Sequence, residues 1–191
     1  KIKSKEAKIA VVGLGYVGLP LAMEFVGAGF RVFGIDVKKD KVDALNAGRS
    51  HVLDVKDEVV LAAVSSGQFK AFDSYEPVTR ADCVSICVPT PLKKTRDPDI
   101  SFVTQAMEGV KPHLHEEMLL VLESTTYPGT TAEIIVPEIE KAGYKVGEEL
   151  FVAFSPERVD PGNRVYTTKN TPKVIGGSTQ KCTETAQFLY E

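Results

Sequence analysis

The chain has 191 residues, and 43% of them are hydrophobic and 26% charged, as in an ordinary globular protein with one well-cored domain. This composition excludes disordered, collagen-like and disulfide-scaffold proteins. The formal net charge of −3 provides no basic field for nucleic acid or anionic lipid, and no apolar run is long enough to predict a membrane span.

The first half of the chain alternates apolar runs of strand length with segments of helical periodicity. Residues 8–12 form a continuous apolar run that stops at a glycine, which is typical of a strand buried on both faces of a parallel sheet. Over residues 16–28, Val17, Leu21 and Phe25 recur at helical spacing. The predicted elements that follow are a strand at 31–35, helices at 38–47 and 56–66, and a strand at 69–72.

The second half continues the alternation. Thr130 and Glu133 match a capping box, in which the threonine accepts from the first-turn amides and the glutamate reaches back, and Pro137 is expected to bend the helix. The predicted elements are a strand at 83–88, a helix at 101–110, strands at 118–122, 151–154 and 173–175, and a helix from 179 onward. This pattern predicts an α/β fold of the Rossmann type, a doubly wound, mostly parallel sheet with helices on both faces.

A glycine-rich loop joins the first predicted strand to the first helix. The sequence GLGYVG at residues 13–18 matches the dinucleotide fingerprint at the position that its mechanism requires. Gly13 permits a tight turn, Gly15 lets backbone amides approach a pyrophosphate, and Gly18 allows close packing of helix on strand. The alternative is a tight strand-to-helix turn without a ligand.

An acidic residue at the expected distance supports the cofactor interpretation. Asp36 ends the second predicted strand, 21 residues after Gly15, where a carboxylate can accept hydrogen bonds from the adenosine ribose. It would repel a 2′-phosphate, so the sequence favours NAD over NADP. Lys38, Lys39 and Lys41 weaken this inference slightly because a basic side chain could accommodate that phosphate.

Two later loops are candidates for the nicotinamide side of a site. Pro89 and a second proline stiffen the loop after the strand at 83–88 and leave Thr90 as its polar contact. The loop at 123–129 carries the carboxylate of Glu123 and several hydroxyls where a nicotinamide and an alcohol could meet. The alternative for this second loop is a Ser/Thr-rich turn that leads into a capped helix.

A third loop, at residues 155–163, combines charges with prolines after a predicted strand. Glu157, Arg158 and Asp160 lie together at the expected carboxyl edge of the sheet. This grouping indicates recognition of a polar or anionic ligand, and a surface turn is the alternative.

Together these segments resemble the UDP-glucose/GDP-mannose dehydrogenase family, and the resemblance covers nearly the whole chain. Its motifs are GLGYVGLPLA at 13–22, CVPTPL at 87–92, ESTTYPGTT at 123–131 and SPERVDPGN at 155–163. The resemblance implies oxidation of the C6 alcohol of a nucleotide-linked sugar to a carboxylate, with two NAD+ and a cysteine-bound thiohemiacetal and thioester. The last motif is most similar to the UDP-N-acetylglucosamine branch; UDP-N-acetylmannosamine and UDP-glucose dehydrogenases are the alternatives.

The resemblance also implies roles for individual residues. Thr125 and Glu157 are expected to be catalytic, the first helping to bind the hydrolytic water and the second handling a proton. Glu157 and Arg158 are expected to contact substrate. The expected cofactor-binding residues are Gly13, Gly15, Tyr16, Val17, Gly18, Asp36, Lys41, Pro89, Thr90, Ser124 and Thr125.

The sequence departs from the family in two ways. The glycine-flanked catalytic cysteine is absent, so we expect residues 1–191 to be an NAD-binding domain that is inactive alone, with the central dimer helix and the UDP-binding domain beyond Glu191. Cys83, Cys87 and Cys182 fall on predicted buried elements, and their odd number without a CxxC pair argues against a disulfide framework or a zinc site. Pro161 lies near where the UDP-glucose branch carries an acidic residue, which disfavours UDP-glucose.

The expected partners are a UDP-sugar substrate and, for the full-length protein, a second copy in a homodimer. Nucleic acid, metal and membrane are not expected. Reduced cysteines and the lack of a signal-peptide pattern predict a cytoplasmic location. Two other functions stay open, namely a non-catalytic nucleotide-sensing module and a hydroxyacid or 6-phosphogluconate type dehydrogenase, against which the third loop argues.

Overall fold

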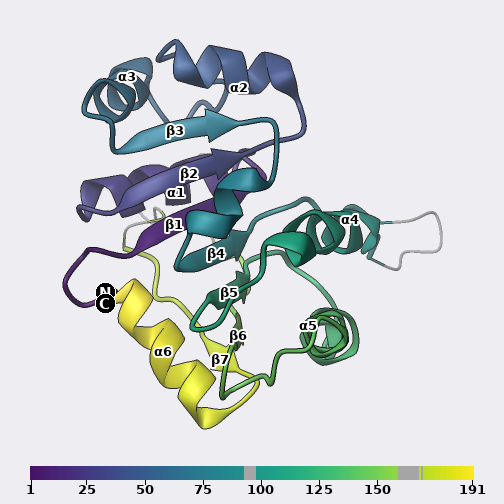
Figure 1. The fold of residues 1–191 in the computed structure, drawn as a ribbon. Helices are drawn as coiled ribbons and strands as arrows, with labels where there is room; N and C mark the ends of the chain where they lie inside the picture. The colour runs from purple at the N-terminus through teal and green to yellow at the C-terminus, as the bar shows by residue number, and fades with distance from the viewer. Residues whose placement is uncertain (93–97, 159–167, 169) are drawn as a thin grey trace.

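The centre of the fold is a seven-stranded sheet in the order β3-β2-β1-β4-β5-β6-β7 (Figure 1). The computed structural model describes residues 1–92, 98–158, 168 and 170–191. Neighbouring strands from β3 to β6 pair in parallel, and only β7 is antiparallel to its neighbour. The strands are β1 (Lys8–Val12), β2 (Arg31–Ile35), β3 (Phe69–Phe72), β4 (Cys83–Ile86), β5 (Leu119–Leu122), β6 (Phe151–Phe154) and β7 (Gly176–Gly177). The order of the parallel strands is that of dinucleotide-binding sheets, so the predicted fold is confirmed.

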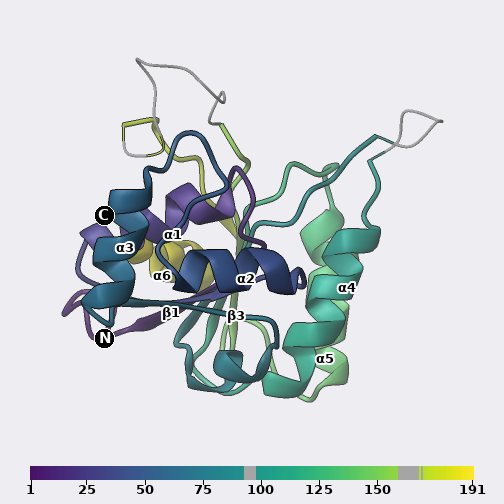
Figure 2. The ribbon, with the colours of Figure 1, turned by 90° about the horizontal axis from the view of Figure 1, so that it is seen from above.

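Helices cover both faces of this sheet. The α-helices are α1 (Gly18–Gly27), α2 (Lys39–Asn46), α3 (Asp57–Ser65), α4 (Ser101–Val110), α5 (Val136–Lys141) and α6 (Gln180–Tyr190), and the short helical segments are η1 (Glu76–Arg80), η2 (Lys111–His113) and η3 (Thr131–Ile135). Figure 2 separates α4 and α5 on one side from α1, α3 and α6 on the other. Among the described residues, no helix has the length and apolar character needed to cross a membrane.

Two hydrophobic cores, one on each face, explain the uninterrupted apolar runs of the sequence. Ile9 and Val11 of β1 pack into the core beneath α1, α3 and α6, and Ala10 and Val12 pack into the core beneath α4 and α5. Because successive side chains of a strand point to opposite faces, a strand covered on both faces is apolar throughout. The carboxyl ends of the parallel strands then meet at one edge of the sheet, where the candidate loops emerge.

Most predicted elements are present with ends shifted by one or two residues, and one strand is misplaced. The strand predicted at 173–175 is wrong, because the antiparallel pairing with β6 begins only at Gly176. Lys173 instead reaches toward Glu123, with which it forms an ion pair. The strand position at Gly177 requires glycine, because a Cβ there would lie 2.2 Å from the backbone nitrogen of Thr183 in α6. The segment before β7 is therefore shaped by an ion pair and by close packing.

The predicted capping box at Thr130 and Glu133 is wrong as well. Thr130 already has helical dihedral angles, so its hydroxyl donates back to the carbonyl of Tyr127 at 2.7 Å and caps no amide. The carboxylate of Glu133 accepts from the Tyr127 hydroxyl at 3.1 Å. The chain then makes a π-type turn, η3, before α5 begins at Val136, and Pro137 lies in the first turn of α5. Near the proline at which a bend was predicted, the helix therefore changes from π-type to α-helical hydrogen bonding.

Candidate functional site

The glycine loop between β1 and α1 has the geometry that its sequence predicts. Gly13 has φ +90°, and a Cβ there would lie 2.7 Å from the carbonyl oxygen of Cys87, so only glycine fits. A Cβ at Gly18 would lie 1.8 Å from the carbonyl oxygen of Gly13, which fixes the close approach of helix and loop. A Cβ at Gly15, in contrast, would meet no atom within 4 Å. The loop is thus tightly packed at both ends and open at its centre.

The open centre of the loop faces unpaired backbone donors. No hydrogen bond between described residues uses the amides of Gly15, Tyr16 or Val17. The residue that precedes α1 makes no side-chain cap, and the first turn of α1 holds no acidic residue that could occupy its positive end. Such a helix start attracts anions, because its free amides and its dipole both favour negative charge.

Asp36 is held against the glycine loop by hydrogen bonds. One carboxylate oxygen accepts from the amide of Leu14 at 3.1 Å, and the other accepts from the amide of Lys38 at 3.0 Å. The side chain of Lys41 forms an ion pair with the same carboxylate at 3.6 Å. Asp36 is only 8% exposed, so its position is fixed at the end of β2. The structure therefore brings Asp36 and Lys41 beside the glycine loop, as the sequence predicts.

His51, in the connection between α2 and α3, also contacts the glycine loop, and the sequence did not indicate it. Its Nε2 lies 2.7 Å from the carbonyl oxygen of Leu14. Because the carbonyl can only accept, Nε2 carries the proton in this bond. The same residue, Leu14, thus donates to Asp36 and accepts from His51. A lone histidine in a loop carries no local pattern, so only the fold reveals this contact.

The loops after β4 and β5 are tied to each other. The hydroxyl of Ser124 donates to the carbonyl of Val88 at 2.6 Å, and the hydroxyl of Thr90 donates to the carbonyl of Thr125. Thr125 itself is exposed, as is Pro89. The structure therefore brings together the residues that were predicted to line the nicotinamide side, and it orders them by two hydrogen bonds.

Glu123 does not take part in the open site, and the expectation that its carboxylate faces an alcohol is wrong. The residue is fully buried and forms an ion pair with Lys173. It also accepts from the hydroxyls of Tyr190 and Ser85, the latter at 3.4 Å. Burial, followed by the charge of Glu123, raises the pKa of Tyr190 well above its usual value. This cluster lies beneath the loop that begins at Ser124 and joins it to α6 and to the segment before β7.

The loop after β6 carries Glu157 at the same edge of the sheet. Its Oε1 accepts from the amide of Arg158 at 2.8 Å, and the side chain of Arg158 is exposed. Ser155 is fully buried, and its hydroxyl has no hydrogen-bond partner among the described residues. Asp160 and Pro161, which the sequence singled out, lie outside the described residues.

All three cysteines are buried and free. Burial raises the pKa of Cys83 to about 12. Burial also raises the pKa of Cys87, and the nearby charges of Glu123 and Glu157 add to the effect. High pKa values keep these two thiols protonated and inert. No described group of three or more His, Cys, Asp and Glu residues could hold a metal ion.

Tyr16 and Val17 complete the comparison with the sequence. Tyr16 is 60% exposed beside the glycine loop, and Val17 packs partly against the core under α1. The open centre at Gly15 fits a cofactor phosphate, because a side chain at that position would fill the space. The strand order and this loop place the chain among the dinucleotide-binding domains.

Comparison with known proteins gives the family. The profile of the UDP-glucose/GDP-mannose dehydrogenase family, NAD binding domain, matches residues 7–191, so the chain belongs to this family and its cofactor is NAD. The NDP-N-acetyl-D-galactosaminuronic acid dehydrogenase of Ralstonia nicotianae is 39% identical over 192 residues, which cover 96% of this chain and 44% of the relative. The UDP-N-acetyl-D-glucosamine 6-dehydrogenase of Pseudomonas aeruginosa is 36% identical over 187 residues, covering 97% and 43%.

The solved structures agree. The UDP-N-acetyl-mannosamine dehydrogenase Cap5O of Staphylococcus aureus superposes with a TM-score of 0.90 at 34% identity, covering 96% of this chain and 44% of that one. The chain therefore spans less than half the length of the relatives that it matches.

Proposed function

We propose that this chain holds the NAD of an enzyme that oxidises the C6 alcohol of a UDP-linked N-acetylhexosamine, with UDP-N-acetylglucosamine as first choice, to the uronate. Family membership supports this proposal, as do relatives whose names specify dehydrogenases of N-acetylated nucleotide sugars. UDP-N-acetylmannosamine is the nearest alternative substrate, since two dehydrogenases named for that sugar match 96% of the chain at 34% identity. The observation that carries the cofactor part is the open space at Gly15 beside unpaired amides.

The geometry suggests how the chain binds NAD. The amides of Gly15 and of the start of α1, between the tight positions Gly13 and Gly18, would hold the diphosphate. Asp36 would accept from the adenosine ribose with the oxygen lone pairs that its two amide donors leave free, and Lys41 and Tyr16 would flank this half. The nicotinamide side is lined by Val17, Pro89, Thr90, Ser124 and Thr125. NAD supplies the hydride acceptor when bound.

The substrate half of the site is assigned to the exposed ends of β5 and β6. Thr125 orients the hydrolytic water, Glu157 handles the proton, and Arg158 attracts the anionic substrate. Because all three cysteines of the chain are buried, we place the nucleophile outside these 191 residues, in a UDP-binding domain of a homodimeric full-length protein.

Calorimetric titration of the chain with NAD+ tests the cofactor site. Gly15→Ala places a methyl group in open space, so the thermal midpoint should stay unchanged while NAD+ affinity falls about tenfold or more, because the phosphate loses its close approach. Gly27→Ala is the matched control, since a Cβ at that glycine also meets nothing within 4 Å and lies at the far end of α1. Unchanged NAD+ binding by Gly15→Ala would refute the site.

A second experiment tests the reaction. Full-length protein is incubated with NAD+ and, separately, UDP-N-acetylglucosamine, UDP-N-acetylmannosamine and UDP-glucose, and NADH is followed by absorbance. NADH formation with an N-acetylated sugar supports the proposal. NAD+ binding without turnover of any nucleotide sugar would instead favour a nucleotide-sensing module.

A further inference from the structure

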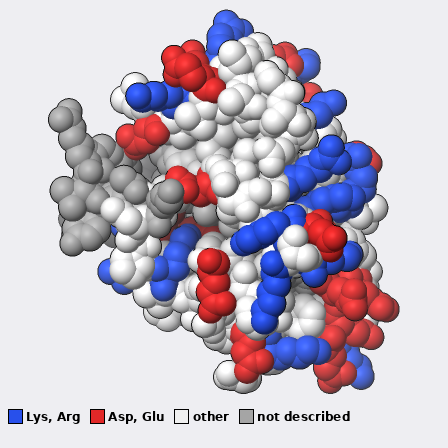
Figure 3. Space-filling model, turned by 90° about the vertical axis from the view of Figure 1, so that its left-hand side faces the viewer, with Lys and Arg blue, Asp and Glu red and all other residues white. Residues whose placement is uncertain are grey.

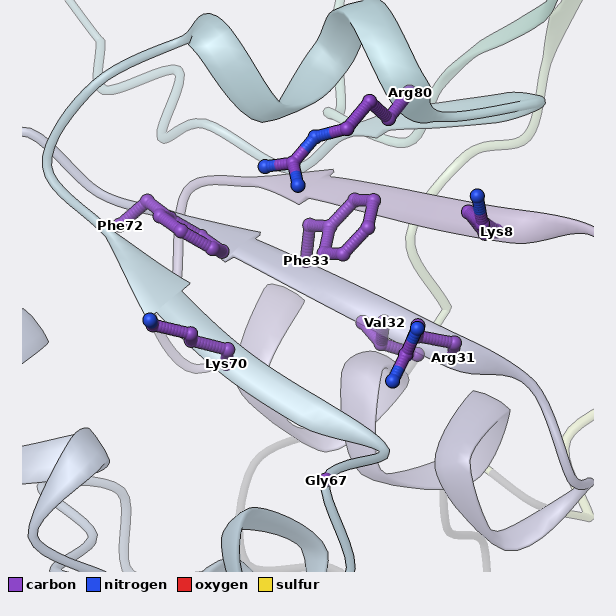
Figure 4. A pocket seen from close by; sticks show the side chains of 8 residues that line it. All are labelled: Lys8, Arg31, Val32, Phe33, Gly67, Lys70, Phe72 and Arg80. Atoms are coloured by element: carbon purple, nitrogen blue, oxygen red, sulfur yellow. The ribbon is translucent and has the colours of Figure 1, made fainter.

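A groove lined by basic side chains crosses the sheet away from the glycine loop. It has a volume of about 320 Å³, and its lining residues are Lys8, Arg31, Val32, Phe33, Gly67, Lys70, Phe72 and Arg80 (Figure 4). Lys8 and Arg31 are the first residues of β1 and β2, whereas the glycine loop follows the last residue of β1. A five-residue strand spans roughly 16 Å, so the Lys8 and Arg31 end of the groove lies about that far from the glycine loop. The Phe72 end lies closer to the proposed cofactor site, because the carbonyl of Phe72 accepts from the amide of Asp36 at 3.1 Å.

The alternation of side chains along β2 and β3 builds this groove. Arg31 and Phe33 point to the same face of the sheet, as do Lys70 and Phe72, and Phe33 pairs with Lys70 across the ladder. The connection from β3 to β4 contains only the five-residue η1, whose last residue is Arg80. A long helix does not cover this part of the face, so the charged side chains stay accessible.

All charged side chains that line the groove are positive. Lys8 and Arg31 are direct partners in the parallel ladder, and like charges in that relation are destabilising. No described residue forms an ion pair with Arg31 or Lys70, and no acidic residue lines the groove. Two carboxylates lie just outside it, since Glu76 pairs with Arg80 at 3.3 Å and Asp82 accepts from the backbone amide of Lys8 at 2.8 Å.

The basic lining of the groove contrasts with the charge of the whole chain. The whole chain is net negative, with a formal charge of −3. Figure 3 shows several lysine and arginine side chains adjacent to one another on the side of the molecule that faces left in Figure 1, with acidic side chains beside them. Three cations of this cluster, Lys8, Arg31 and Lys70, form no ion pair with a described residue, and an external anion explains their grouping better than stability does.

Aromatic rings hold two of the cations in place. The Arg80 guanidinium lies 5.3 Å from the centre of the Phe33 ring, and the Lys70 ammonium lies 5.4 Å from the centre of the Phe72 ring. The two rings pack edge to face with centroids 6.0 Å apart. Figure 4 shows Arg80 and Lys70 on opposite sides of this ring pair, with Lys8 and Arg31 at the other end. Cations ordered on a hydrophobic floor lose less entropy when they bind an anion.

We propose that this groove is a binding site for a diphosphate group, either as free pyrophosphate or as part of a nucleotide. Arginine and lysine are the donors that recognise phosphate oxygens. Of the four cations in the lining, Arg80 pairs with Glu76, and the charges of the other three, Lys8, Arg31 and Lys70, match that of a diphosphate. A volume near the lower end of small-molecule pockets suits such a ligand. The net negative charge of the chain disfavours a nucleic acid as the occupant.

Residue-resolved NMR tests the proposal on the 15N-labelled chain, because it distinguishes the groove from the glycine loop whether or not NAD binds there. Titration with inorganic pyrophosphate should shift the amides of residues 31–33 and 69–72 saturably, and more weakly at high salt. A parallel titration with ADP separates the two sources. If ADP binds the groove more tightly than pyrophosphate does, the ligand is a nucleotide, and if the two affinities are equal, it is free diphosphate. Shifts confined to residues 13–18 would overturn the proposal.

Variants separate binding from folding. Arg31→Thr and Lys70→Thr should each lower pyrophosphate affinity at the groove about tenfold, since each removes a charged donor. Arg31→Thr should also raise the thermal midpoint without ligand, because it relieves the like-charge pair with Lys8. Lys56→Ala, an exposed lysine just before α3, is the control and should change neither quantity. Wild-type affinity in Arg31→Thr and Lys70→Thr would refute the site.

Discussion

Replacing Lys173 should destabilise this domain, because it leaves the buried carboxylate of Glu123 without its positive partner. Lys173 neutralises Glu123, which is 0% exposed, and its own side chain is 21% exposed. Lys173→Met leaves the carboxylate with the hydroxyls of Tyr190 and Ser85 as its side-chain donors among residues 1–92, 98–158, 168 and 170–191. Breaking a buried ion pair from one side costs about 3–5 kcal/mol, and we expect about 3 kcal/mol because two donors remain. For a chain of this length, that loss lowers the thermal midpoint by roughly 6–12 °C.

The opposite replacement should cost less. Glu123→Gln removes the buried charge but keeps an oxygen that accepts from Tyr190, and the partly exposed Lys173 can turn to water. We expect a loss of about 1–2 kcal/mol. In the double variant the two losses should not add, because either single change already removes the pair.

Urea unfolding followed by circular dichroism measures these free energies. Lys145→Met is the control, since Lys145 and Glu148 form an ion pair at 3.8 Å in which both side chains are 73% exposed, and it should cost less than about 0.5 kcal/mol. If Lys173→Met costs no more than Lys145→Met, or if the losses of the double variant are additive, the buried pair does not hold this part of the fold.

Three further predictions concern pH, thiols and cofactor choice. Hydrogen bonds from Lys111 and Lys141 lower the pKa of Glu138 from 4.5 to about 2. The ionised carboxylate should therefore stabilise the fold above pH 4.5, and this contribution should be lost as the pH falls toward 2. Between pH 4.5 and pH 2, the urea midpoint of Glu138→Gln should change less than that of the wild type. A disulfide reagent at pH 8 should label no cysteine quickly in the native chain and all three after unfolding, and fast native labelling would contradict the burial described. Asp36→Asn should weaken NAD+ binding about tenfold and reduce the preference for NAD+ over NADP+. If the ratio of the Kd values for the two cofactors is unchanged, Asp36 is not the residue that selects NAD+.

The parts of this protein that follow local rules were predictable from the sequence. The strand before Gly13, the glycine loop and Asp36 follow from apolar runs, fixed spacing and backbone geometry, and the structure places all of them as expected. The turn at Thr130 was harder to predict, because the hydroxyl of Thr130 has several acceptors within reach and the sequence does not show which one it bonds.

Contacts between distant segments were not predictable. Glu123 meets partners 50 and 67 residues further along the chain, and a carboxylate before a Ser/Thr-rich loop carries no sign that it is buried and paired. His51 reaches Leu14 across 37 residues for the same reason. The strand expected at 173–175 failed because an ion pair and a glycine contact, not strand propensity, decide where pairing begins.

The hydrogen bonds between the loops after β4 and β5 have a mechanical consequence. Because Ser124 holds the carbonyl of Val88, and Thr90 holds that of Thr125, neither loop can shift far without carrying the other. A molecule that immobilises one loop therefore also restricts its neighbour. A second ligand then binds to a loop that is already ordered. Two ligands at this edge can therefore bind cooperatively without a change of structure. The first ligand reduces the motion of both loops, and the second ligand loses less conformational entropy on binding.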